Sequence, residues 1–148
     1  MLLRMALHLL KLCVGADSVE DLHDWIEQRL TEKRRKGLVE EHVHTTRMVP
    51  KRTEELLDGG SLYWVIKGSI QVRQKLIDIR PYNDTRGIRR CDLVLDPHPV
   101  LTSWQPRRAF QGWRYLEHKD IPADVRSSDG IRQLPPHLRV ELAQLGLL

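Results

Sequence analysis

The chain has 148 residues, close to one domain at the usual ~100–200 residues per domain, so we expect residues 1–148 to fold as a single domain. Hydrophobic residues make up 41% and charged residues 30% of the sequence, which excludes a collagen-like or extensively disordered protein. The net charge is +4, and the two cysteines are too few for a disulfide framework, which favours a reducing compartment.

The start of the chain is rich in leucine but does not match a signal peptide. His8 and Lys11 interrupt the run, whereas a signal peptide needs a continuous apolar stretch of about 7–15 residues. No window reaches the roughly 20 apolar residues that a membrane-spanning helix needs. We therefore expect a cytoplasmic protein with no membrane partner.

The first 37 residues predict a strand followed by a long helix. Residues 8–14 alternate with a period of two, which is typical of a strand, and we expect the imidazole of His8 to bond a backbone group within the sheet. Ser18 is a suitable helix N-cap, with Asp21 three residues later as in a capping box. Gly37 follows a basic run and marks the end of the helix. The apolar residues at helical spacing are Val19, Leu22, Trp25, Ile26 and Leu30.

The centre of the chain predicts strands in succession. Residues 38–48 predict a partly exposed strand, and residues 50–57 predict a short helix. Residues 61–67 combine aromatic and β-branched side chains, as strands do. Residues 70–79 alternate and then change phase, which indicates a twisted or bulged strand. A turn at residues 83–87 ends this region.

The remainder of the chain predicts more strands and then an irregular end. Residues 88–95 predict one strand, and shorter strands are expected around 100–104 and 110–116. Residues 117–136 are polar and contain Pro, Gly and Ser, so we expect an irregular surface segment. Residues 137–146 have leucines at helical spacing and predict a C-terminal docking helix.

This order of elements predicts an α+β fold. Consecutive strands separated by turn signals favour a mainly antiparallel sheet over a parallel α/β fold, with one long N-terminal helix and short helices beside it. We expect the sheet to be partly closed and barrel-like. The sequence leaves open whether the barrel closes.

Positive charge is concentrated in the second half of the chain. Residues 67–114 hold ten basic and four acidic side chains, a net charge of +6, and most of the basic residues are arginines. Residues 104–115 alone contain three arginines and four of the eight aromatic residues. Basic groups that follow a phosphate backbone, beside rings that stack on bases, are what single-stranded nucleic-acid binding requires. The residues we predict to contact nucleic acid are Lys67, Arg73, Arg107, Arg108, Trp113 and Arg114.

A structural role is the alternative for each part of this pattern. The aromatic side chains can belong to the core with the arginines as a solvated rim. His42 and His44 share one strand face and are the start of a metal site, but no third ligand has matching spacing, so we interpret them as exposed strand histidines. Cys91 lies among aliphatic residues and is interpreted as a small hydrophobic residue. We expect no metal and no cofactor, and no pattern identifies catalytic residues.

Three sequence blocks carry a resemblance to a known family: HLLKLCVGADSVEDL at residues 8–22, DGGSLYWVIKG at 58–68 and RRAFQGWRYL at 107–116. Together they resemble a bacterial family of uncharacterised proteins, a domain of unknown function, which implies no established activity. The rhythm of residues 60–79 is also similar to PUA-like barrels, the group that contains ASCH and EVE domains. That similarity implies a barrel-like sheet and a link to RNA or modified bases, although Gly-Gly-Ser stands here where that group tends to have Gly-Asp.

Three functional hypotheses follow. The first is an RNA-binding or nucleic-acid-binding module that does no chemistry on its ligand. The second is a small-ligand hydrolase or transferase with a pocket near Tyr63, Trp64 and Arg114. The third is an interaction protein whose partner covers an apolar patch at the C-terminal helix. The sequence does not specify an oligomeric state.

Overall fold

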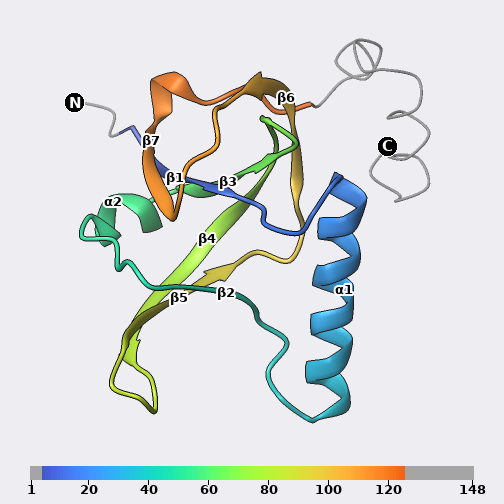
Figure 1. Ribbon diagram of the computed structural model, residues 1–148, viewed down its shortest axis with the longest axis vertical. Coiled ribbons are helices and arrows are strands. Elements are labelled where there is room, and N and C mark those ends of the chain that lie inside the picture. The colour runs from blue at the N-terminus through green and yellow to red at the C-terminus, as the bar shows by residue number, and fades with distance from the viewer. Residues whose placement is uncertain (1–4, 126–148) are drawn as a thin grey trace.

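The computed structural model describes residues 5–125 and shows a strongly bent sheet with one long helix beside it (Figure 1). The elements, in chain order, are β1 (Leu7–Leu12), α1 (Val19–Arg35), β2 (His42–Thr46), α2 (Thr53–Leu57), β3 (Ser61–Ile66), β4 (Ser69–Asn83), β5 (Arg89–Leu95), β6 (Val100–Pro106), β7 (Trp113–Glu117) and the short 3-10 helix η1 (His118–Asp120). Each strand begins and ends within about four residues of the range that the sequence predicts.

The sheet is mixed but largely antiparallel, which confirms the α+β class. Its strands follow the order β2-β5-β4-β3-β1-β7, and β1–β3 is its parallel pair among the described strands. The long strand β4 pairs with β6 along residues 69–73 and with β5 along residues 76–83. Because β6 and β5 share one edge of β4 in this way, the sheet divides into two arms.

The expectation of a barrel-like sheet is wrong for the described residues. β2 and β7 lie at the two ends of the strand order and do not pair with each other. β6 reaches the segment after β7 through the isolated bridge between Thr102 and Asp124. The division of β4 between two partner strands separates the ends that a barrel would have to join.

The helix α1 begins and packs as its sequence pattern predicts. The Ser18 hydroxyl accepts a hydrogen bond from the Asp21 backbone N–H at 3.1 Å, and the Asp21 carboxylate accepts one from the Asp17 N–H at 2.8 Å. These two bonds satisfy N–H groups that have no partner within the helix. Val19 and Ile26 are buried in the main core, whereas the Trp25 ring on the same face is 36% exposed.

The two faces of the central strands contribute to two separate cores. Leu9 and Trp64 belong to the larger core, which α1 covers. Their chain neighbours Leu10 and Tyr63 point the other way and belong to a second core with Leu116. The alternation predicted for residues 8–14 is therefore confirmed, because successive side chains in a strand point to opposite faces.

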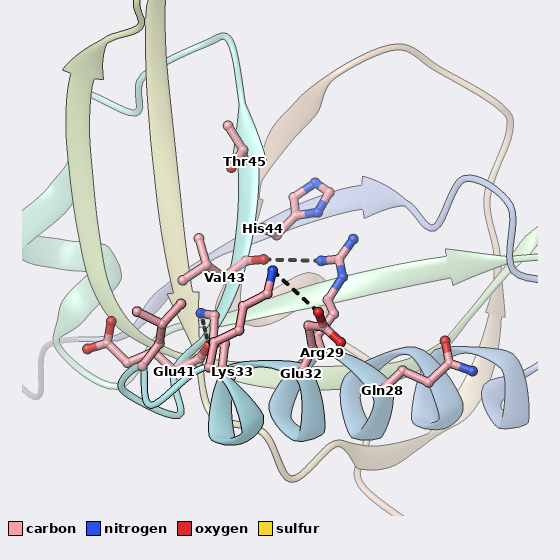
Figure 2. Close-up of a pocket in the computed structure, with 10 residues that line it drawn as sticks. Gln28, Arg29, Glu32, Lys33, Glu41, Val43, His44 and Thr45 are labelled. Carbon is pink, nitrogen blue, oxygen red and sulfur yellow. Dashed lines mark hydrogen bonds and ion pairs between the residues drawn. The ribbon is translucent and has the colours of Figure 1, made fainter.

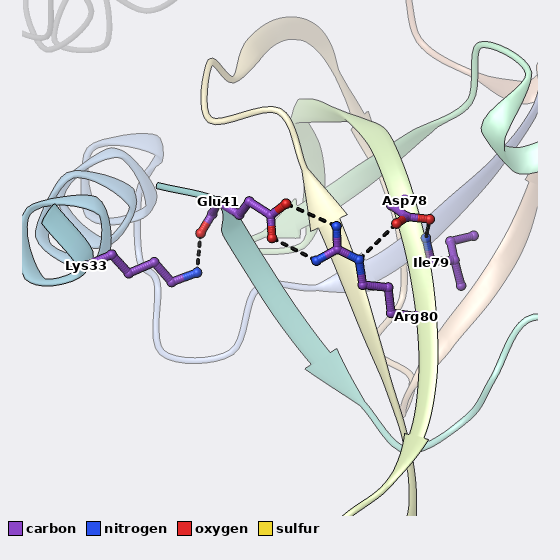
Figure 3. Close-up of polar contacts among 5 residues, drawn as sticks. All are labelled: Lys33, Glu41, Asp78, Ile79 and Arg80. Atoms are coloured by element: carbon purple, nitrogen blue, oxygen red, sulfur yellow. Dashed lines mark hydrogen bonds and ion pairs between the residues drawn. The ribbon is translucent and has the colours of Figure 1, made fainter. Parts of the chain in front are cut away.

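An ion-pair network fixes the position of β2 against β4 (Figure 3). The Arg80 guanidinium donates two hydrogen bonds to the Glu41 carboxylate, at 2.7 and 3.0 Å, and one to Asp78 at 2.8 Å. These bonds lower the pKa of both carboxyl groups. The Lys33 ammonium donates to the Glu41 backbone carbonyl, which ties the end of α1 to the same point.

The end of the chain is described only in part. The predicted docking helix at residues 137–146 lies outside the described residues, as do residues 126–136 of the predicted irregular segment. The described part of that segment contains the last residue of β7, η1 and an extended stretch. Among the described helices, none has the length and apolar character needed to cross a membrane.

Candidate nucleic-acid interface

The connection between β6 and β7 forms one wall of a pocket of about 670 Å³. The connection is attached to the rest of the fold by a hydrogen bond from the Arg107 N–H to the Gly68 carbonyl, at 2.8 Å. Gly112 has a φ of +69°, a conformation that favours glycine, and it turns the chain into β7. The charged and aromatic residues that line the pocket are Arg52, Arg107, Arg108, Phe110, Arg114, Tyr115, Glu117 and Asp120.

Three of the predicted contact residues meet in this pocket. Arg108 and Arg114 are exposed, and Arg107 is half-buried. The guanidinium carbon of Arg114 lies 4.8 Å from the centre of the Phe110 ring, a cation–π geometry. No ion pair joins any of these three arginines to a carboxylate within residues 5–125.

Arg107 has unused hydrogen-bonding capacity. Its Nη2 donates to the Gln105 side-chain carbonyl at 2.7 Å, but its Nε is buried without a partner among the described residues. A buried N–H that bonds neither protein nor water raises the free energy of the folded state, by about 1–3 kcal/mol for a typical group. An oxyanion in the pocket would satisfy this group, because a guanidinium presents its N–H groups as a fork that fits phosphate.

The opposite wall comes from the start of α2 and from β7. The Tyr115 hydroxyl accepts hydrogen bonds from the backbone N–H groups of Lys51 and Arg52, at 2.9 and 3.2 Å. The Arg52 guanidinium lies 5.5 Å from the Tyr115 ring centre and pairs with Glu55. These contacts hold a fourth arginine at the pocket. The sequence gives no sign of it, because Arg52 lies more than 50 residues before the arginines that it joins.

Trp113 does not belong to this surface. Its side chain is 5% exposed, and its Nε1 donates a hydrogen bond to the Met48 carbonyl at 2.6 Å. Its ring meets the Tyr115 ring edge to face, with 4.9 Å between the ring centres. The proposed base-stacking role of Trp113 is therefore wrong, since stacking needs an exposed ring face. Phe110, which is half-buried at the pocket, is the aromatic residue in the position that the prediction gave to Trp113.

Two other predicted contacts lie away from the pocket. Arg73 forms a two-point ion pair with Asp124, at 2.8 and 2.7 Å, and donates a third hydrogen bond to the Ser61 hydroxyl. Lys67 lies at the two-residue turn between β3 and β4 and pairs with Asp17 at 3.2 Å. The structure thus brings together three of the six residues and leaves Lys67, Arg73 and Trp113 outside the pocket.

Arg73 is expected to contribute to stability. Its side chain is 21% exposed and that of Asp124 is 12% exposed, so an Arg73→Met substitution removes a two-point ion pair from a largely dry position. We expect the free energy of unfolding to fall by about 3 kcal/mol, as for other buried ion pairs that lose one partner. Urea unfolding of Arg73→Met and of Arg89→Met, an exposed arginine on β5, measures the difference. Equal stability of the two variants would contradict this role.

The alternative pocket near Tyr63, Trp64 and Arg114 is not formed. Tyr63 and Trp64 are adjacent on β3 and point to opposite faces of the sheet, where they are 2% and 3% exposed. Arg114 lines the β6–β7 pocket, to which neither ring contributes. Three residues in this arrangement do not surround one ligand.

The interpretation of His42 and His44 as exposed is also wrong. His42 is 3% exposed and His44 is half-buried, with its ring edge to face against Trp64 and 5.0 Å between the ring centres. The expectation for His8 is confirmed, because its Nδ1 accepts a hydrogen bond from the Ser61 backbone N–H at 3.0 Å. Cys91 is fully buried as expected, and burial raises the pKa of its thiol.

Comparison with known proteins identifies the family. A family model described as "Protein of unknown function (DUF1489)" matches residues 9–148. The chain belongs to this family. The match includes the β6–β7 pocket and confirms the resemblance to a family of uncharacterised proteins, whereas the similarity to PUA-like barrels is not confirmed. No curated protein and no solved structure matches this DUF1489 chain.

Proposed function

We propose that this DUF1489 chain binds single-stranded nucleic acid, RNA foremost, through Arg107, Arg108 and Arg114, without doing chemistry on it. The observation that carries the proposal is that these arginines line one pocket and none is paired with a carboxylate of the described chain. Guanidinium groups in this state are available to bind phosphate oxygens in two-point geometry.

The pocket offers two kinds of contact that a nucleotide uses. Arg107 and Arg108 provide donors for the phosphate, and the buried Nε of Arg107 gains the partner that it lacks. Phe110 and the Arg114 guanidinium form a cation–π pair, with 4.8 Å from the guanidinium carbon to the ring centre, and an unpaired base stacks on groups of this kind. Glu117 and Asp120 line the same pocket and repel phosphate groups. The nucleic-acid strand therefore passes along the side of the pocket that Arg108 forms.

The proposal is tested by the affinity of a single-stranded probe. Fluorescence anisotropy with a labelled uridine oligomer of about 12 nucleotides, within the range of single-stranded sites, measures binding at low salt. We expect Arg108→Gln to weaken binding about tenfold, because a hydrogen bond to a charged group contributes about 1.5 kcal/mol. We expect a similar loss for Arg114→Gln, because the stacking of one base contributes about 1–3 kcal/mol.

A matched control lies at the far end of the molecule. Arg86 is exposed on the β4–β5 hairpin, away from β6 and β7 (Figure 1), and Arg86→Gln removes the same charge there. We expect this variant to bind the oligomer as the parent chain does. Equal weakening by Arg86→Gln would show a diffuse attraction to positive charge, and the proposed pocket would then be wrong.

We also propose a cytoplasmic location. Cys13 and Cys91 are both unpaired and buried, which fits a reducing compartment. Burial raises the pKa of Cys13 to about 12, so its thiol is protonated and unreactive at neutral pH.

A further inference from the structure

A second pocket, of about 220 Å³, lies between α1, the end of β1 and the strand β2. It is on the α1 side of the sheet and is separate from the β6–β7 pocket that Arg107, Arg108 and Arg114 line. Its lining includes Lys11, Leu22, Arg29, His42, His44 and Trp64. These residues combine an apolar wall of indole and aliphatic groups with several nitrogen donors, and no carboxylate is among them.

Two imidazoles in this pocket have unsatisfied nitrogens. His42 is 3% exposed, and its Nδ1 is buried with no hydrogen-bond partner among the described residues. The Nε2 of His44 is in the same state. Burial lowers the pKa of each ring to about 4, so both rings are neutral at physiological pH. In a neutral imidazole one nitrogen donates a hydrogen bond and the other accepts one.

Two cations face the same space. Lys11 lies beside Trp64 in the β1–β3 register, and burial lowers the pKa of its ammonium. Arg29 donates one hydrogen bond to the Val43 carbonyl at 3.2 Å, and its guanidinium lies close to the imidazole of His44 (Figure 2). No ion pair joins Lys11 to a carboxylate of residues 5–125. A partly desolvated ammonium in this state is costly, and a bound anion offsets that cost.

The wider groove beside this pocket differs from it in having carboxylates in its lining. It has a volume of about 780 Å³ and shares Arg29, His44 and Thr45 with the pocket (Figure 2). Its carboxylates already have partners: Glu32 pairs with Lys36 at 3.3 Å, and Glu41 pairs with Arg80. The groove therefore gives access to the smaller pocket, whose lining holds cations and no carboxylate.

We propose that this pocket binds a small carboxylic acid with an apolar body. The carboxylate lies between the Lys11 ammonium and the Arg29 guanidinium and accepts from His44, and the hydrocarbon part lies against Trp64 and Leu22. The volume is below the ~300–1,000 Å³ of pockets that hold drug-sized ligands, so the acid is of small-metabolite size. A zinc ion is disfavoured because two cations repel it and because no three His, Cys, Asp or Glu side chains of residues 5–125 are grouped as metal ligands would be.

The test uses carboxylates and their neutral amides as matched probes. Benzoate, phenylacetate and hexanoate are titrated into the full chain, and the imidazole nitrogen signals of His42 and His44 are followed by NMR. We expect saturable shifts with at least one acid, at a dissociation constant of about 1 mM or lower. The corresponding amide is expected to bind at least about tenfold more weakly, because it lacks the charge.

Variants identify the residues that hold the anion. We expect Lys11→Met to weaken carboxylate binding about tenfold, with Arg29→Met as a second variant at the other side. Lys51→Met, an exposed lysine outside the pocket, is the control and is expected to have no effect. The proposal is overturned if no acid shifts the two imidazoles, if amides bind equally well, or if Lys11→Met and Arg29→Met leave the affinity unchanged. It is also overturned if inorganic phosphate or Zn²⁺ shifts the imidazoles and the acids do not.

Discussion

Replacement of Gly60 by alanine is expected to lower the free energy of unfolding by more than about 3 kcal/mol, beyond ordinary overpacking. A Cβ at this position would lie 2.2 Å from the Leu7 carbonyl oxygen and 2.3 Å from that of Leu56. Both contacts are with backbone atoms, so the rotation of a side chain cannot relieve the clash. The Gly60 N–H also donates to the Leu56 carbonyl at 2.9 Å, which closes the turn from α2 into β3.

Gly59→Ala provides the matched comparison for Gly60→Ala. Gly59 has a φ of +91°, but the nearest atom to an added Cβ is the Ala6 Cβ at 3.9 Å. We expect this variant to lose only about 1–2 kcal/mol, the cost of a left-handed backbone for a residue with a Cβ. Chemical denaturation of both variants measures the difference. A Gly60→Ala chain as stable as Gly59→Ala would contradict the close approach of β1 and α2 at this point.

Acid is expected to destabilise the fold well above the pH at which carboxylates titrate. Burial lowers the pKa of His8, His42 and His44 from 6.5 to about 4. The unfolded chain therefore takes up protons below pH 6.5 that the folded chain does not bind. The stability is fully present above pH 6.5 and is lost as the pH falls toward 4, at up to about 1.4 kcal/mol per pH unit for each histidine.

His8 allows this prediction to be tested residue by residue. Its Nδ1 accepts from the Ser61 N–H, so protonation of that nitrogen breaks the bond, whereas an asparagine oxygen can accept the same bond at any pH. Urea unfolding between pH 7 and pH 4 should give a shallower pH dependence for His8→Asn than for the parent chain. A parent stability that stays flat from pH 6.5 to pH 4.5 would show that these imidazoles are not buried as described.

Local sequence patterns predict most of the helices and strands, because caps, apolar spacing and alternation act over a few neighbouring residues. The Ser18 cap and the apolar spacing of α1 determine that helix and its buried face, and the alternation in β1 determines a strand whose two faces both become buried. The bulges between Leu76 and Asp78 and between Ile70 and Val72 account for the change of phase in residues 70–79. The division of β4 between two partner strands depends on long-range pairing, which no local pattern encodes, so the barrel expectation fails.

The candidate site is only partly predictable for the same reason. Arg107, Arg108 and Arg114 are close in sequence, and β6 and β7 bring them to one pocket. Composition does not distinguish Phe110 at the pocket from Trp113 in the core, because both belong to one aromatic run. Asp124, which pairs with Arg73, follows it by 51 positions, and that separation hides the partner from any local pattern.

The most direct test of nucleic-acid binding by the β6–β7 pocket is the salt dependence of the binding constant. On single strands, the slope of log K against log salt concentration changes by about 0.7 for each phosphate contact. We predict a slope of about −1.4 for the parent chain, in which Arg107 and Arg108 contact phosphate, and of about −0.7 for an Arg108→Gln/Arg114→Gln chain, which keeps one such contact. The control chain with Arg86→Gln and Arg89→Gln should keep the parent slope. A parent chain that shows no binding at low salt, or identical slopes for all three chains, would contradict the assignment of this pocket.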